Sequence, residues 1–152
     1  MRRLGLFVFY DKDGIVDEYV EYLISDLKSV VSELIIIVNG QVTVEAEHIL
    51  KKYSNQYYIR ENIGFDAGAY ADVIVNILGE QKLSHYDELV LCNDTFYGPF
   101  VSFKKIFDTL SNEQCAFWGL DCIKRDFLSY IIMYICVFRG PMLKNGDLFN
   151  YF

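Results

Sequence analysis

Two kinds of hydrophobic pattern alternate along the chain. Short, continuous apolar runs predict buried strands, which we expect at residues 4–10, 33–38, 56–60, 88–92, 115–120 and 130–138. Longer stretches, in which apolar residues recur every three or four positions, predict helices, which we expect at residues 16–31, 45–53, 67–78 and 103–110.

This alternation determines the expected fold class. Apolar strands separated by helices of about ten to fifteen residues are typical of a parallel sheet covered on both faces. We therefore predict an α/β fold, doubly wound, with a mainly parallel sheet and helices on both faces. Because 152 residues without an internal repeat or linker fit one core, we expect a single domain over residues 1–152.

Composition narrows the possible partners. Hydrophobic residues make up 53% of the chain, which excludes disorder, and the net charge of −7 with scattered Lys and Arg argues against nucleic-acid binding. Aromatic residues reach 16%, and the aromatic-rich segments 96–100 and 148–152 are candidates for contact with a partner domain or a second copy.

The longest apolar run and the cysteines bear on location. The run at residues 130–138 is too short to cross a bilayer, and the N-terminus shows no cleavage site, so we predict no transmembrane segment and a cytoplasmic protein, with the inner face of the membrane as a second location. The cysteines show no CxxC pairing and lie in apolar runs, which predicts reduced core thiols at Cys92, Cys115, Cys122 and Cys136.

Polar residues follow the first four predicted strands. In doubly wound sheets, ligands bind beyond the carboxyl ends of the strands, near the point where strand order reverses. Helix capping and turn formation are the simpler explanation for any single strand end. Four such ends together favour a binding site, whose candidate residues are Tyr10, Asp11, Asn39, Asn62, Gly64, Asp66, Asn93 and Asp94.

The segment E-N-I-G-F-D-A-G-A-Y, residues 61–70, stands between a strand and a helix. Gly64 and Gly68 would let a ligand approach the helix N-terminus, where free backbone N–H groups attract an anion. The spacing is not G-x-G-x-x-G, so it gives a Rossmann dinucleotide site only weak support. Asp66 is suited either to accept a hydrogen bond from a ribose or sugar hydroxyl or to cap the helix.

The fourth strand ends in Asn93-Asp94. A carboxylate at this position suits Mg²⁺ or Mn²⁺, which prefer oxygen ligands and commonly bridge substrate phosphates. The alternative for Asp94 is an Asx-turn leading into Gly98-Pro99. A receiver-like phosphoacceptor domain, with Asp11, Asp13 and Asp94 as the acidic group and Lys124 as its lysine, is a further alternative.

Several motifs resemble one family. N-I-G-F-D-A-G-A-Y, followed by Y-D-E-L-V-L-C-N-D-T-F-Y-G-P-F, F-W-G-L and V-F-R, is similar to the rhamnan synthesis F family of cell-wall polysaccharide glycosyltransferases, over roughly residues 6–139. More distantly the chain resembles inverting GT-A glycosyltransferases. The resemblance implies a nucleotide pocket lined by Asn62, Gly64 and Asp66, with Tyr10 and Asp11 near the base.

The resemblance also implies a metal-binding D-x-D motif with Asp94 as its last residue. Cys92 stands in place of the first acid, so metal binding would rest on Asp94 with Asn93 assisting. Asn39 stands where many such enzymes place an Asp.

The implied activity is transfer of a sugar, rhamnose by resemblance, from a nucleotide diphosphate-sugar donor to a glycan acceptor. The family fold continues into an acceptor-binding half that carries the general base, and the sequence ends at residue 152 with Asp147 as the one candidate base after Asp126. A non-catalytic nucleotide-sugar-binding or assembly module is therefore the competing interpretation.

Overall fold

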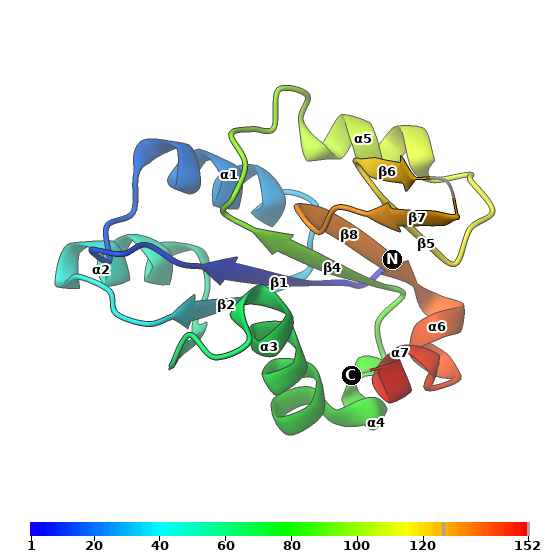
Figure 1. The fold of residues 1–152 in the computed structure, drawn as a ribbon, viewed down its shortest axis with the longest axis horizontal. Helices are drawn as coiled ribbons and strands as arrows, with labels where there is room; N and C mark the ends of the chain where they lie inside the picture. The colour runs from blue at the N-terminus through cyan, green and yellow to red at the C-terminus, as the bar shows by residue number, and fades with distance from the viewer. Residues whose placement is uncertain (126, 152) are drawn as a thin grey trace.

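The computed structural model describes residues 1–125 and 127–151, which form an α/β arrangement (Figure 1). The strands are β1 (Arg3–Phe9), β2 (Glu33–Asn39), β3 (Gln56–Arg60), β4 (Glu88–Asn93), β5 (Phe117–Gly119), β6 (Cys122–Arg125), β7 (Leu128–Ile131) and β8 (Ile135–Arg139). The helices are α1 (Glu18–Lys28), α2 (Val44–Tyr53), α3 (Phe65–Ala71), the π-helix η1 (Asp72–Leu78), α4 (Gly79–Leu83), α5 (Phe103–Leu110), α6 (Gly140–Lys144) and α7 (Asp147–Tyr151).

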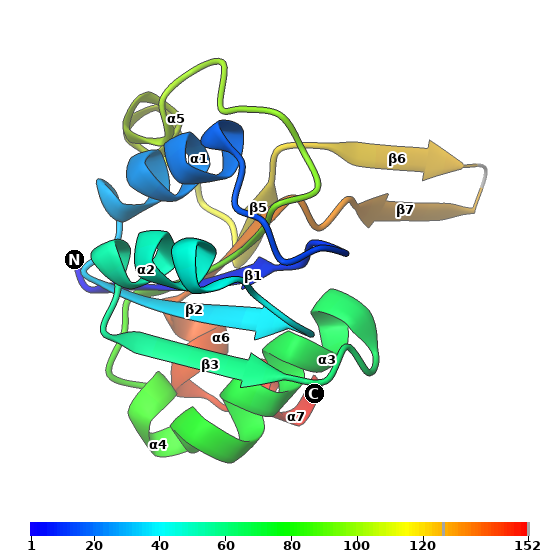
Figure 2. The same cartoon turned by 90° about the vertical axis from the view of Figure 1, so that its left-hand side faces the viewer.

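Six strands form the main sheet in the order β3-β2-β1-β4-β8-β5. β3, β2, β1 and β4 run parallel, while β8 is antiparallel to both β4 and β5. The sheet is therefore mainly parallel, as predicted. β6 and β7 form a separate hairpin that projects from the body (Figure 2).

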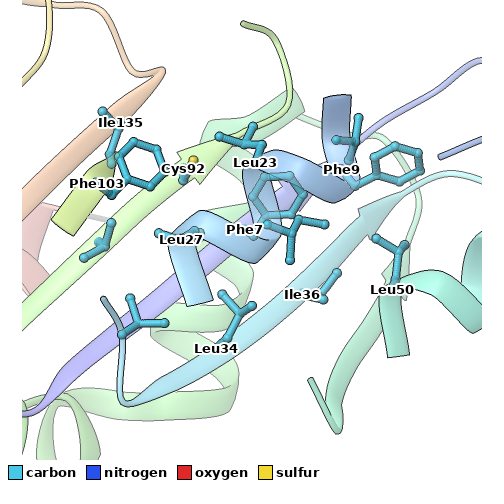
Figure 3. Close-up of a cluster of buried hydrophobic side chains, with 14 of the residues drawn as sticks. Phe7, Phe9, Leu23, Leu27, Leu34, Ile36, Leu50, Cys92, Phe103 and Ile135 are labelled. Atoms are coloured by element: carbon cyan, nitrogen blue, oxygen red, sulfur yellow. The ribbon is translucent and has the colours of Figure 1, made fainter. Parts of the chain in front are cut away.

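Helices cover both faces of this sheet (Figure 2). On one face, α1, α2 and α5 bury a core that includes Phe7, Leu23, Ile36, Leu50 and Phe103 (Figure 3). On the other face, α3, η1, α4, α6 and α7 pack over alternate strand residues such as Leu6, Ile37 and Leu91. The doubly wound prediction is confirmed, because successive residues of the central strands point to opposite faces of the sheet and pack into two separate cores.

Several predicted elements have different bounds in the structure. The helix expected at 16–31 spans only Glu18–Lys28, because the chain turns at Ser29 and Val30 to enter β2. The strand expected at 115–120 is limited to Phe117–Gly119. The run at 130–138 is not one strand but parts of two, β7 in the hairpin and β8 in the main sheet, separated by a turn of apolar residues.

The helix expected at 67–78 begins two residues earlier, at Phe65, and changes from α to π geometry at Asp72. Its N-cap residue is Gly64, which has a φ of 75°. The interpretation of Asp66 as the N-cap is therefore wrong, since Asp66 lies inside the first turn.

The cysteine prediction holds for two of the four residues. All four thiols are free, and Cys92 and Cys136 are buried. Cys115 and Cys122 are exposed, because each lies just outside a strand of the main sheet, on connecting loop or hairpin. Within residues 1–125 and 127–151, no helix has the length and apolar character needed to span a membrane.

Candidate functional site

The site lies where the strand order reverses, between β1 and β4. Tyr10 follows β1, and its backbone N–H donates to Oδ2 of Asp94, which follows β4, over 2.9 Å. The side chain of Asp94 therefore ties together the carboxyl ends of the two strands that flank the reversal.

Asp66 reaches the same edge from α3. Its Oδ2 accepts a hydrogen bond from Nδ2 of Asn93 over 2.6 Å, and Oδ1 of Asn93 accepts from the hydroxyl of Thr95 over 2.8 Å. Asp66 and Asp94 therefore lie at one edge of the sheet, although the strands that precede them are separated in the strand order. β3 and β4 are not neighbours, since β2 and β1 lie between them, and α3 brings Asp66 back across the sheet.

Burial controls the charge of Asp94, whose exposed fraction is 6%. Burial raises the pKa of this carboxyl to about 6; hydrogen bonds from the backbone N–H groups of Tyr10 and of Asp94 itself oppose the rise, and the negative charges of Asp66 and Asp11 add to it. A cation placed here would relieve the repulsion among these carboxylates.

Arg60, at the end of β3, organises the neighbouring loop. Its guanidinium donates to Oδ2 of Asp72 over 2.6 Å and to Oδ1 of Asn39 over 2.7 Å. It also donates to the carbonyl oxygen of Ile63 over 2.8 Å. Sequence reasoning missed Arg60, although a charged residue closing a strand just before Asn62 was a usable signal.

Two predicted binding residues retain buried polar atoms without a protein partner. These atoms are Nδ2 of Asn39 and Oδ1 of Asn62. Because unsatisfied buried polar atoms are costly, a ligand or an ordered water is expected to complete them. The hydroxyl of Tyr70, a fully buried residue of α3, also lacks a hydrogen-bond partner.

The structure gives each glycine of the segment a structural reason. Gly64 adopts the left-handed conformation that starts α3. A Cβ at Gly68 would overlap the carbonyl oxygen of Ile63, so only glycine allows the helix to lie this close to the preceding loop. Access for a ligand is not required to explain either residue.

Tyr10 and Asp11 follow β1 at the carboxyl edge of the sheet. Oδ1 of Asp11 accepts from the backbone N–H groups of Asp13 and Ile15, which shapes the turn after β1. The ring of Tyr10 is half exposed and lies beside Gly40. The receiver-like alternative is wrong, because such domains have the strand order 2-1-3-4-5, whereas here β2 and β4 flank β1 and Lys124 lies on the separate β6–β7 hairpin.

A family model for rhamnan synthesis protein F matches residues 34–152. The chain belongs to this family. Membership indicates involvement in the synthesis of rhamnan, a cell-wall polysaccharide. A search of curated proteins found no match.

The match to the rhamnan synthesis protein F family contains most of the site. Asn39, the segment 62–66, Asn93 and Asp94 fall inside it, whereas Tyr10 and Asp11 precede its first residue. Cys92 is fully buried in the core beneath α1 and α5 (Figure 3). Its side chain packs in the hydrophobic core.

Two cavities lie at opposite edges of the main sheet. One, of about 340 Å³, is apolar and begins two residues after Asp94; its lining includes Phe96, Tyr97, Pro99 and Tyr134. The other, of about 250 Å³, lies at the opposite, amino-terminal edge, where β2 and β3 begin, and its lining includes Lys28 and Lys52.

Proposed function

We propose that this protein binds a nucleotide diphosphate-sugar at the edge between β1 and β4, as the donor-binding domain of a glycosyltransferase-like activity in rhamnan synthesis. The observation that carries the proposal is the convergence of Tyr10, Asp66, Asn93 and Asp94, joined by two hydrogen bonds at the strand-order reversal. A GT-A-like arrangement of the donor is part of this proposal.

The polar groups suit parts of such a donor. Asp66 uses one carboxylate oxygen on Asn93, which leaves the other to accept from a ribose or sugar hydroxyl. The unpaired atoms of Asn39 and Asn62 offer one donor and one acceptor. Gly64 starts α3 between Asn62 and Asp66, and the half-exposed ring of Tyr10 is available to stack on the base.

Mg²⁺ or Mn²⁺ fits these residues with one protein carboxylate as its ligand. In the described part of the chain, no three His, Cys, Asp or Glu side chains come together as a metal cage. Asp94 would therefore be the single carboxylate ligand, with diphosphate oxygens and water completing the shell, an arrangement common for Mg²⁺. When bound, the ion would neutralise charge on the departing diphosphate.

Transfer also needs a base to deprotonate the acceptor hydroxyl. Asp147 lies at the start of α7, where its carboxylate accepts from Nδ2 of Asn145, and Asp126 lies outside the described residues. Donor binding without transfer is thus the second candidate function, and it is favoured by the burial of Cys92 in place of the first acid of D-x-D.

A thermal-shift panel tests donor binding. A nucleotide diphosphate-sugar at ten times its Kd should stabilise the fold by about 1.4 kcal/mol, which corresponds to a rise in Tm of roughly 3 to 6 °C. The rise should grow with Mg²⁺ or Mn²⁺ for deoxythymidine and uridine diphosphates. No rise at millimolar ligand, with or without metal, would overturn the proposal.

Two variants make this panel specific. Asp94→Asn should remove the metal-dependent part of the rise, measured against its own ligand-free Tm. Asp108→Asn removes a carboxylate from the exposed face of α5, where it pairs with Lys104, and should respond as the wild type does. An activity assay distinguishes an enzyme from a binding module. An enzyme would release free sugar from the donor or transfer it to a rhamnan oligosaccharide, and a binding module would do neither.

A further inference from the structure

The apolar cavity after β4 has four aromatic residues among the nine that line it. It has a volume of about 340 Å³ and is lined by Phe96, Tyr97, Gly98, Pro99, Phe100, Val101, Ile106, Leu120 and Tyr134. Tyr97 and Phe100 are highly exposed, at 72% and 95%. Small-molecule pockets commonly have volumes of about 300–1,000 Å³ and apolar walls, so the cavity is large enough for one sugar ring.

Contacts join this cavity to the candidate site. Tyr19, on α1, donates from its hydroxyl to the backbone oxygen of Asp94 over 3.4 Å. The ring of Tyr19 also lies 4.5 Å, centroid to centroid, from the ring of Tyr97. The side chain of Tyr19 thus contacts both the carboxyl edge of the sheet and the lining of the cavity.

Two contacts hold parts of the cavity lining together. Phe96 packs against Tyr134 with centroids 5.7 Å apart, and the hydroxyl of Tyr22 donates to the carbonyl oxygen of Pro99 over 3.4 Å. A wall fixed in this way needs little ordering when a ligand arrives, which favours binding.

We propose that this cavity holds one sugar ring of the glycan acceptor, stacked on Tyr97 and Phe96; this inference rests on the proposed donor site. A pyranose has an apolar face of C–H groups that matches an aromatic wall, while its hydroxyls lie around the ring's edge. Asp94 and Thr95 directly precede Phe96, the first residue of the cavity lining. An acceptor bound there would present a hydroxyl towards the sugar to be transferred.

A sugar suits the cavity better than the other apolar occupants. The net charge of −7 disfavours an anionic lipid surface. The chain belongs to a rhamnan synthesis family, so the proposed transfer at the neighbouring site would use a glycan as its acceptor. An alkyl chain and a second copy of the protein are outcomes that the test must separate.

The test is amide chemical-shift mapping by NMR on the full chain without nucleotide. Methyl rhamnoside and a rhamnose trisaccharide serve as probes. Saturable shifts are expected at residues 95–101, with Gly98 as reporter, and tighter binding is expected for the trisaccharide. Tyr97→Ala should weaken binding about 3- to 10-fold, as expected for loss of one stacking ring.

A matched control comes from the hairpin. Phe127 lies in the turn between β6 and β7 and is fully exposed, outside the cavity lining. Phe127→Ala should bind both probes as the wild type does. Equal weakening in both variants would show non-specific contact and overturn the proposal.

Other results would also overturn it. Shifts at 95–101 with hexanol but not with the sugars would assign the cavity to an alkyl chain. A dimer in sedimentation experiments that becomes a monomer in Phe100→Asp would assign it to a second copy. If nucleotide diphosphates raise the Tm while the sugars leave residues 95–101 unshifted, this inference fails and the donor site stands. Sugar shifts without any nucleotide effect would remove the donor site and, with it, the assignment of the bound sugar as the acceptor.

Discussion

Asp94 carries a charge that the fold holds at a cost. Its pKa is raised to about 6, above the ordinary value of about 3.9, so the folded state binds a proton more tightly than the unfolded chain does. The stabilisation from this proton is complete below about pH 4 and is lost as the pH rises through 6. In metal-free buffer this linkage is worth on the order of 3 kcal/mol.

Asp94→Asn should remove this pH dependence. The amide oxygen can still accept from the backbone N–H of Tyr10, so the variant is expected to be more stable than the wild type at pH 7 and nearly equal to it at pH 4. Denaturant unfolding at the two pH values, in EDTA, gives the measurement. A variant that is less stable at pH 7 would show that the carboxylate stabilises the fold.

Gly68 can be tested by adding one methyl group. Gly68→Ala should lower the unfolding free energy by about 1–3 kcal/mol, because the new Cβ overlaps the carbonyl oxygen of Ile63. Gly140→Ala is the matched control, since an added Cβ there meets nothing closer than 3.4 Å. Equal unfolding midpoints for the two variants would contradict the packing explanation.

At this scale the sequence predicted strand-end residues well. Asn93 and Asp94 end a continuous apolar run, so their place at the edge follows from the pattern alone. The parts played by Arg60 and Tyr19 depend on contacts between distant segments, which no local pattern encodes. Capping by Asp66 was one of two alternatives from the sequence, because a glycine N-cap with positive φ leaves no polar signal.

Among the elements, the loop between β3 and α3 depends on Arg60. Arg60→Ala would leave Oδ1 of Asn39 and the carbonyl of Ile63 without their donor, and we expect a loss of about 1–3 kcal/mol. Hydrogen exchange should speed up at residues 61–64 more than in β1. Lys104→Ala, which breaks an exposed pair on α5, should change stability by less than about 0.5 kcal/mol. Unchanged exchange at 61–64 would refute this role.

The thiols distinguish the main sheet from its appendages. Cys92 and Cys136 lie buried in β4 and β8, and burial raises the pKa of Cys136 to about 11. Cys115 and Cys122 are exposed. Mass spectrometry after a short maleimide pulse at pH 7 should find label on Cys115 and Cys122 in the native protein and on all four after denaturation. Rapid native labelling of Cys92 would contradict the buried β4.

Hydrophobic pattern located the central strands closely, since β2 to β4 begin and end within a residue of expectation. It failed at residues 130–138, because a turn built of Ile132, Met133 and Tyr134 is as apolar as the strands that it joins. The hairpin was missed for the same reason.

For the whole molecule, the sequence indicated the layers but not the strand order. Alternating strands and helices predict a covered parallel sheet. The return of the chain from β3 across the sheet to β4, however, depends on contacts between distant segments, which the local pattern does not encode. That return places the reversal between β1 and β4 and brings Asp66 to Asn93, even though their strands are not neighbours.

The central claim is the place at which a nucleotide diphosphate binds. Backbone amide NMR, with deoxythymidine diphosphate rhamnose and Mg²⁺ titrated into the full chain, tests it most directly. We predict saturable shifts at residues 10–14, 39–40, 62–68 and 93–95. Asp94→Asn should lose only the part of these shifts that depends on metal. Shifts confined to the amino-terminal edge, around the cavity that contains Lys28 and Lys52, or no shifts at millimolar ligand, would contradict the claim.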